Sequence, residues 1–138
     1  MRATPFNHET DLPPIPFDET HCRLAAKLKE AGLPWKPHVG CFVWDRDEHI
    51  PVPSPFPGRI YFILNLHRFL EIFGSVEQVA DCLVWLPTWH QARLLCSSLG
   101  VHDRDVTDML CSEKPSEAGK DLLALYETLL NVLVDETG

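Results

Sequence analysis

The sequence predicts a single α+β domain in which about five helices cover one face of a small antiparallel sheet. Three observations support this fold class: short runs of β-branched and aromatic residues, longer segments with helical periodicity, and two proline-rich connections. With 138 residues, 45% of them hydrophobic, the chain can bury a core of its own. We expect residues 1–17 to form an extended, proline-rich arm and residues 18–138 to form the domain.

The first predicted helix follows this arm. It carries Leu24 and Leu28 on one face, with lysines on the opposite face. Its N-cap is Asp18 or Thr20, because either side chain can accept a hydrogen bond from a free amide of the first turn. Gly32 provides the left-handed residue that ends the helix.

Three apolar runs have the composition of buried strands, namely residues 40–45, 59–64 and 82–87. The first and third share the pattern Cys-x-Val-Trp, which we interpret as two similar buried strands rather than a repeat. Residues 45–48 are predicted to form a turn. Residues 49–53 are then a candidate returning strand, which their prolines restrict to a sheet edge.

The middle of the chain carries N-cap signals for three further helices. They are Asn65, Ser75 with Gln78, and Thr88 with Gln91. In the last two, a hydroxyl and a glutamine three residues later have the spacing of a capping box. Gly74 ends the helix that begins after Asn65.

The C-terminal part of the chain is predicted to end in a very apolar helix. Residues 122–134 are apolar at ten of thirteen positions, so this helix is central to its domain or shared with a second subunit. Pro115 suits the first turn of this helix. A shorter helix is predicted from Asp103 or Asp105 to Leu110.

Charge and cysteine content exclude several classes of function. The net charge is −8, with no basic stripe, which argues against binding to nucleic acids or to anionic membranes. No apolar segment is long enough to span a membrane. The N-terminus lacks the apolar core of a signal peptide, and the five cysteines are scattered without a Cys-x-x-Cys pair. We therefore expect a cytoplasmic protein with reduced thiols.

Residues 45–49 contain three carboxylates and an imidazole, a composition that could hold a divalent metal. Alternate residues of a hairpin point to opposite faces, so we favour a solvent-exposed turn. The spacing of His38 and Cys41 is also that of metal ligands, but a catalytic zinc site needs three. The alternative function is a small metal-dependent hydrolase that uses His38, Asp45, Asp47 and His49.

Other catalytic signatures are missing. There is no Gly-x-Ser-x-Gly motif and no glycine-rich phosphate loop, so we expect no nucleotide and no other cofactor. Two cysteine–histidine pairs, Cys82 with His90 and Cys96 with His67, remain open as nucleophile and base. On balance we favour a protein that is not an enzyme.

The aromatic residues and the prolines provide the candidate contact surface. Tryptophans beside prolines form core wedges, and they also form grooves and interface anchors. The loop at residues 51–57 either packs on the chain's own tryptophans or is itself a segment that a partner recognises. The residues that we predict to make contacts are Trp35, Trp44, Pro53, Pro55, Phe56 and Trp89.

Two segments of the chain resemble a loose set of small bacterial and phage-encoded α+β proteins. They are "AAKLKEAGLPW" at residues 25–35 and "VWLPTWHQARLLCSSLG" at residues 84–100. The set shares a helix that ends in Lys-x-x-Gly before an aromatic or Leu-Pro pair, a tryptophan-rich middle, and a Pro-Thr helix start. The sequence departs from it at Leu33, where Phe is more usual, and in the proline-rich loop. Because the set has no assigned activity, the resemblance implies a fold and a prokaryotic origin but no catalytic residue.

The function that these observations favour is a non-enzymatic, cytoplasmic protein–protein interaction module. The apolar final helix and the proline-rich arm suggest that it self-associates as a homodimer, because symmetric dimers often exchange such elements. A small-ligand sensor with an aromatic pocket is a third hypothesis, beside the metal-dependent hydrolase.

Overall fold

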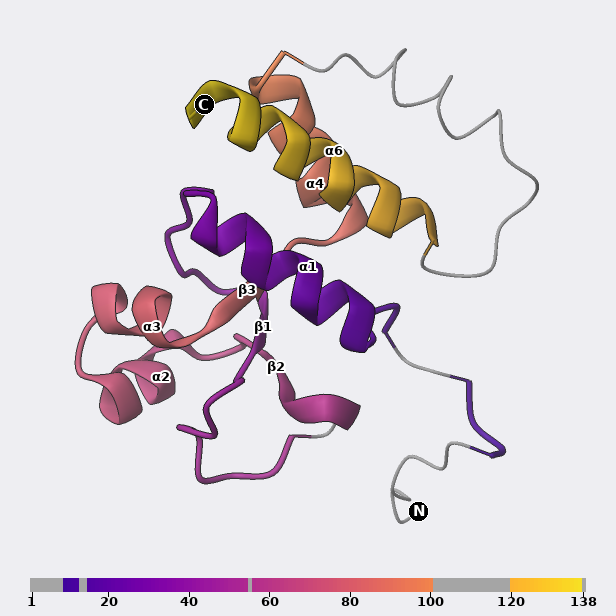
Figure 1. The fold of residues 1–138 in the computed structure, drawn as a ribbon. Helices are drawn as coiled ribbons and strands as arrows, with labels where there is room; N and C mark the ends of the chain where they lie inside the picture. Colours follow the sequence, from indigo (N-terminus) through magenta and orange to yellow (C-terminus); the bar gives the residue numbers. More distant parts are fainter. Residues whose placement is uncertain (1–8, 13–14, 55, 101–119, 138) are drawn as a thin grey trace.

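The computed structural model describes residues 9–12, 15–54, 56–100 and 120–137 (Figure 1). Within them, five helices and a three-stranded antiparallel sheet confirm the predicted α+β class. In chain order the elements are α1 (Glu19–Glu30), β1 (Phe42–Trp44), a 3-10 turn η1 (Pro57–Arg59), β2 (Ile60–Phe62), α2 (Leu66–Phe73), α3 (Val76–Cys82), β3 (Val84–Leu86), α4 (Trp89–Ser98) and α6 (Lys120–Thr137).

The sheet has the strand order β2-β1-β3, so the two strands with the Cys-x-Val-Trp pattern lie side by side. Val43 in the centre of β1 is paired with Tyr61 on one side and with Trp85 on the other. The prediction of a returning strand at residues 49–53 is wrong. The prolines there cannot donate to a ladder, and the strand that pairs with β1 begins only at Ile60.

Helices cover both faces of the sheet, where we expected them on one face. The side chains of Val43, Tyr61 and Trp85 point to the face covered by α2 and α3. Those of Ile60, Val84 and Leu86 point to the opposite face, which packs against α1, and α6 then covers α1 (Figure 1). Both faces of the small sheet are therefore buried, as the apolar composition of its strands requires.

The helix caps follow the sequence closely. Asp18 caps α1, Asn65 caps α2 and Thr88 caps α4. Thr88 and Gln91 form the predicted capping box, whereas Ser75 accepts from the amide of Gln78 without the reciprocal bond. These bonds are local in sequence, so short-range patterns suffice to predict them.

The final helix α6 is central to its own domain. Its buried side chains pack between α1 and α4, and they are Leu122, Leu125, Tyr126, Leu129 and Leu133. The Tyr126 hydroxyl donates a hydrogen bond to the carbonyl of Pro87, which ties α6 to the segment after β3. The buried face of α6 is thus covered by the same chain, which removes the reason to expect that this face is shared with a second subunit.

The last residues of the arm belong to the core, because Ile15 and Phe17 are buried against α1 and the sheet. The predicted helix from residue 103 to residue 110 and its neighbour Pro115 lie outside the described residues. Among the described helices, none has the length and apolarity that a membrane crossing requires.

Candidate functional site

Of the six residues predicted to contact a partner, the five that the structure describes do not form one surface. Trp44 and Phe56 pack half-buried on the core beneath α1, and the ring of Phe56 lies edge-on to Phe42 at 5.8 Å. Pro53 is exposed on the loop between β1 and β2, and Trp89 is exposed on α4. Pro55 lies outside the described residues. Trp35 belongs to a separate pocket.

The four metal-ligand candidates are not brought together either. The Nε2 atom of His38 lies 3.4 Å from the Sγ atom of buried Cys41, and its Nδ1 atom lies 2.9 Å from the carbonyl of Val39. The Nε2 atom of His49 lies 3.9 Å from a carboxylate oxygen of Asp47, and its ring lies edge-on to Phe73. In the described part of the chain, no group of three or more His, Cys, Asp or Glu side chains is placed to hold a metal ion.

The prediction that the acidic turn faces solvent is wrong for Asp45, whose side chain is completely buried. One carboxylate oxygen accepts from the backbone amide of His49 at 2.9 Å. The other accepts from the amide of Ile50 at 2.8 Å and from the Arg59 guanidinium at 2.6 Å. We call this arrangement the Asp45 cluster. Every polar atom of the buried carboxylate has a partner, so its burial is compensated.

The Asp45 cluster fixes the loop between β1 and β2 at its base. Arg59 also donates to the carbonyls of Asp45 and Ile50, and its hydrogen bond to Asp45 raises the pKa of the guanidinium further. Nearer the end of the loop, Tyr61 donates its hydroxyl to the carbonyl of Val52. The loop therefore has a network of hydrogen bonds of its own. Residues 51–53, in the middle of the loop, are exposed. We call these three residues the proline tip.

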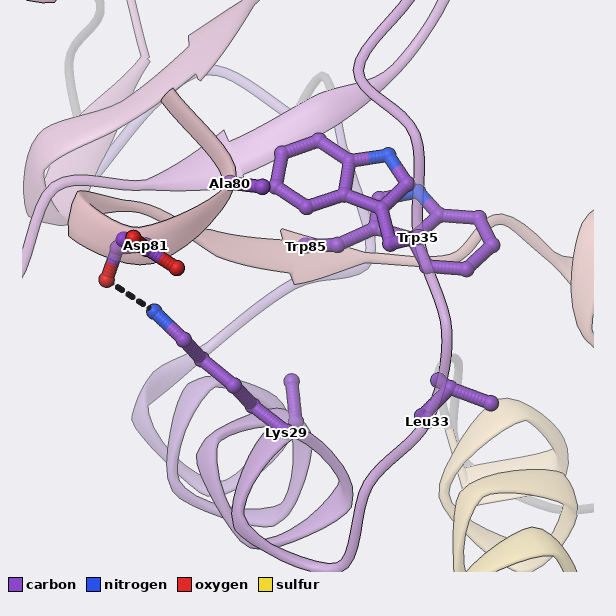
Figure 2. A pocket seen from close by; sticks show the side chains of 7 residues that line it. Lys29, Leu33, Trp35, Ala80, Asp81 and Trp85 are labelled. Carbon is purple, nitrogen blue, oxygen red and sulfur yellow. Dashed lines mark hydrogen bonds between the residues drawn. The ribbon is translucent and has the colours of Figure 1, made fainter. Parts of the chain in front are cut away.

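A pocket beside β3, the edge strand opposite β2, has the properties of a binding site (Figure 2). It is a hollow of about 250 Å³ between the second half of α1, the segment after it, α3 and β3, and we call it the tryptophan pocket. Its lining residues are Ala25, Lys29, Leu33, Trp35, Ala80, Asp81 and Trp85. The indole rings of Trp35 and Trp85 are stacked almost in parallel, at 8° and 5.9 Å between centroids.

The two stacked indoles carry unsatisfied polar atoms. The Nε1 atoms of both Trp35 and Trp85 are buried, and neither has a hydrogen-bond partner among the described residues. A buried donor without a partner costs on the order of 1 kcal/mol or more, because it loses its hydrogen bonds to water and gains none. Two such donors side by side therefore mark a place where an acceptor from another molecule would be stabilised.

Lys29 adds a positive charge to the same pocket. Its Nζ atom donates to the carbonyls of Asp81 at 2.5 Å and Leu83 at 3.1 Å, the first of which is drawn in Figure 2. These carbonyls lie at the C-terminal end of α3, where a cation is favourable. Burial, and to a lesser extent the charge of Arg46, lower the pKa of Lys29. An ammonium group has three donors, so one remains for a ligand.

Sequence reasoning missed Trp85 and Lys29, although one signal for each was present. Val84 and Leu86 point to α1, so strand alternation requires Trp85 to point to the opposite face. Lys29 is in the last turn of α1, where a long side chain can reach past its own helix. Its acceptors lie 52 and 54 residues later in the chain, and no local pattern indicates that distance.

A second hollow of about 250 Å³ lies along the exposed face of α4. Its lining residues are Trp89, His90, Arg93, Leu94 and Ser97, and the Arg93 guanidinium lies 5.9 Å from the centre of the Trp89 ring. All of these side chains come from one helix, so they form a groove on its surface rather than a site that several elements enclose. The tryptophan pocket is therefore the stronger candidate.

Comparison of the chain with protein-family models, with curated proteins and with solved structures finds no match, so the candidate site rests on its own geometry.

Proposed function

We propose that the chain is a non-enzymatic protein-binding module, and that it holds a short extended segment of a protein partner in the tryptophan pocket. The observation that carries the proposal is the pair of buried, unpartnered indole N–H groups of Trp35 and Trp85. Both are donors, as is the remaining N–H of Lys29. A partner therefore has to bring acceptors, and the carbonyl groups of an extended backbone supply them.

The size of the pocket favours a protein segment over a small molecule. Sites for drug-sized ligands usually enclose roughly 300–1,000 Å³. The tryptophan pocket, at about 250 Å³, is smaller and suits one or two side chains of a larger partner. Tryptophans are also the residues that most often dominate the affinity of protein interfaces.

Both indole Nε1 atoms are covered in the free protein, so the two rings have to part before an acceptor reaches them. An apolar side chain that enters the pocket and inserts between the two stacked rings would separate them. The energy of the broken stack, about 0.5–1.5 kcal/mol, is offset when each N–H gains a hydrogen bond.

The proposal includes a cytoplasmic location. The described cysteines, Cys22, Cys41, Cys82 and Cys96, are all free thiols, which fits a reducing compartment.

A random-peptide library displayed on phage tests the proposal. We expect clones that bind the wild-type protein and lose binding to Ala80→Gln, which fills the pocket while keeping a good helix former on α3. The matched control is Trp89→Phe on the separate groove of α4, which should bind the same clones unchanged. If no clone depends on the pocket, the protein-binding function is wrong.

Variants that remove a single donor sharpen this test. Trp35→Phe and Trp85→Phe keep an aromatic ring but remove the N–H. Each should weaken the binding of a selected peptide by about 2- to 10-fold, because one hydrogen bond contributes about 0.5–1.5 kcal/mol. Unchanged affinity in both variants would show that the N–H groups are not the contacts.

A further inference from the structure

We propose that the segment held by the tryptophan pocket is the proline tip, residues 51–53, of a second copy of this chain. The inference rests on the proposed protein-binding function and adds to it the identity of the partner. The apolar face of α6, which was the first reason to expect self-association, is covered by the same chain. The contact between the proline tip and the tryptophan pocket takes its place as the reason. None of the residues that line the pocket comes from the loop of the same copy, so the two surfaces are available to different molecules.

The proline tip exposes an apolar side chain that a partner could bind. Pro51, Val52 and Pro53 are all exposed, and 53% of Val52 is accessible to solvent. An exposed valine flanked by two prolines is an apolar projection that its own domain leaves uncovered. Its volume suits a hollow made for one or two side chains.

The hydrogen-bonding capacity of the tip matches that of the pocket. The carbonyls of Pro51 and Pro53 accept no hydrogen bond from any described residue. The two prolines also lack an N–H, so the tip offers acceptors with a single backbone donor. Once the two rings part, the pocket offers the opposite set: the indole N–H groups of Trp35 and Trp85 and one N–H of Lys29.

The loop is held in place before any contact is made. The Asp45 cluster fixes its base, and the hydroxyl of Tyr61 holds the carbonyl of Val52. Ser54 donates its hydroxyl to the carbonyl of Ile60 and accepts from the amide of Phe56. Because these bonds and the two proline rings already restrict the tip, little conformational entropy is lost on binding.

The contact joins two different surfaces, so it is heterologous. Copies that associate in this way form rings or open chains rather than a twofold dimer. Each copy carries a net charge of −8, and like charges repel. Salt screens this repulsion, so added salt should strengthen the association rather than weaken it.

Sedimentation equilibrium of the full chain at increasing concentration tests the inference. We expect the average mass of the wild-type protein to rise with concentration, and to rise further when salt is added. Val52→Asp places a charge on the tip, and Ala80→Gln fills the pocket, so each variant alone should remain a monomer. Val134→Asp, on α6, is the matched control with a similarly exposed valine, at 52%, and should behave like the wild type.

An equal mixture of the two blocked variants gives the sharpest outcome. Val52→Asp retains an intact pocket and Ala80→Gln retains an intact tip, so one contact can form between them. We expect a species of two chains and nothing larger. Association of either variant alone, species larger than two chains in the mixture, or a mixture that stays monomeric while the wild type associates would overturn the inference.

The experiment also separates this inference from the proposed function. A wild-type protein that stays monomeric at every concentration and salt level, but binds selected peptides through the pocket, would overturn the second copy as the partner and leave the protein-binding function intact. A protein that shows neither behaviour would overturn both.

Discussion

The Asp45 cluster and the tryptophan pocket both remove polar groups from water, but only the first satisfies them within the chain. The carboxylate of Asp45 accepts from two backbone amides and from Arg59. The indole N–H groups of Trp35 and Trp85 have no partner among the described residues. The two regions lie on the same small sheet, so the difference between them is one of local chemistry.

The difference follows from the free energy that each buried group would cost if it had no hydrogen-bond partner. An unpaired buried carboxylate costs several kcal/mol, so the loop between β1 and β2 could not fold around it without its three donors. An unpaired indole N–H costs on the order of 1 kcal/mol, which a folded domain can tolerate. The satisfied site is therefore structural, and the unsatisfied one is where we propose that a partner adds free energy.

The largest predicted effect concerns the structural role of the Asp45 cluster. Asp45→Asn removes the charge and turns one acceptor of the carboxylate into a donor that faces backbone amides and Arg59. We expect a loss on the order of 3 kcal/mol in the free energy of unfolding, measured by chemical denaturation. Asp47→Asn, whose side chain is exposed in the same turn, should change it by less than about 0.5 kcal/mol. Equal effects of the two substitutions would contradict a structural role for Asp45.

The second prediction concerns a buried group that the fold keeps uncharged. Burial, together with the charges of Asp18 and Glu19, raises the pKa of the Cys22 thiol from 9.0 to about 12. The unfolded chain then loses this proton at a lower pH than the folded one. The stability contributed by the neutral thiol is complete below pH 9 and is lost as the pH rises towards 12.

The resulting slope is at most about 1.4 kcal/mol per pH unit for this one group. It is measured as the free energy of unfolding between pH 9 and pH 12. Cys22→Ala should flatten the curve, although Tyr126, whose pKa burial also raises, keeps part of the slope. An unchanged curve in the Cys22→Ala variant would show that the thiol ionises with equal ease in the two states.

The third prediction separates the structural from the binding role of Lys29. Lys29→Met keeps the aliphatic stem but leaves the carbonyls of Asp81 and Leu83 without this donor. Because the site is only partly buried, we expect a loss of about 1 kcal/mol in the free energy of unfolding. Binding of a phage-selected peptide should weaken as well, in a calorimetric titration. Full affinity with reduced stability would limit Lys29 to its structural role.

The smallest predicted effect tests whether the indole N–H groups of the tryptophan pocket lack partners in the folded protein. Trp35→Phe and Trp85→Phe each remove an N–H whose burial without a partner costs on the order of 1 kcal/mol, but each also loses the packing of one ring of the stacked indole. The two effects oppose each other, so the free energy of unfolding, measured by thermal unfolding, should change by about 0.5 kcal/mol or less. Tyr126→Phe is the matched control, because its hydroxyl does have a partner, the carbonyl of Pro87. It should lose about 1 kcal/mol. A tryptophan variant that loses as much as Tyr126→Phe would mean that its N–H is paired in the folded protein.

The sequence predicted the features that depend on neighbouring residues. The N-caps Asn65 and Thr88 and the end of α2 at Gly74 were confirmed, because each involves bonds within one turn of helix. The three strands were found from their composition. For the final helix the sequence left two alternatives, a position central to its domain or a face shared with a second subunit, and the structure shows the first.

The sequence could not predict contacts between distant residues. The burial of Asp45 depends on Arg59, 14 residues later, and an acidic turn alone indicates exposure. The position of helices on both faces of the sheet follows from where α2 and α3 pack, and their capping signals do not contain that information. Of the residues that line the pocket, Trp35 was among the candidate contact residues, but its stacking on Trp85 joins residues 50 positions apart in the chain.

The indole region of a two-dimensional ¹H–¹⁵N spectrum tests the central idea most directly, with a phage-selected peptide added stepwise to the full chain. We expect the Nε1–H signals of Trp35 and Trp85 to move downfield as the complex forms, because both protons gain acceptors. The signal of Trp89 on α4 should stay in place. A complex that forms while the first two signals remain unchanged would show that the indole N–H groups are not the contacts.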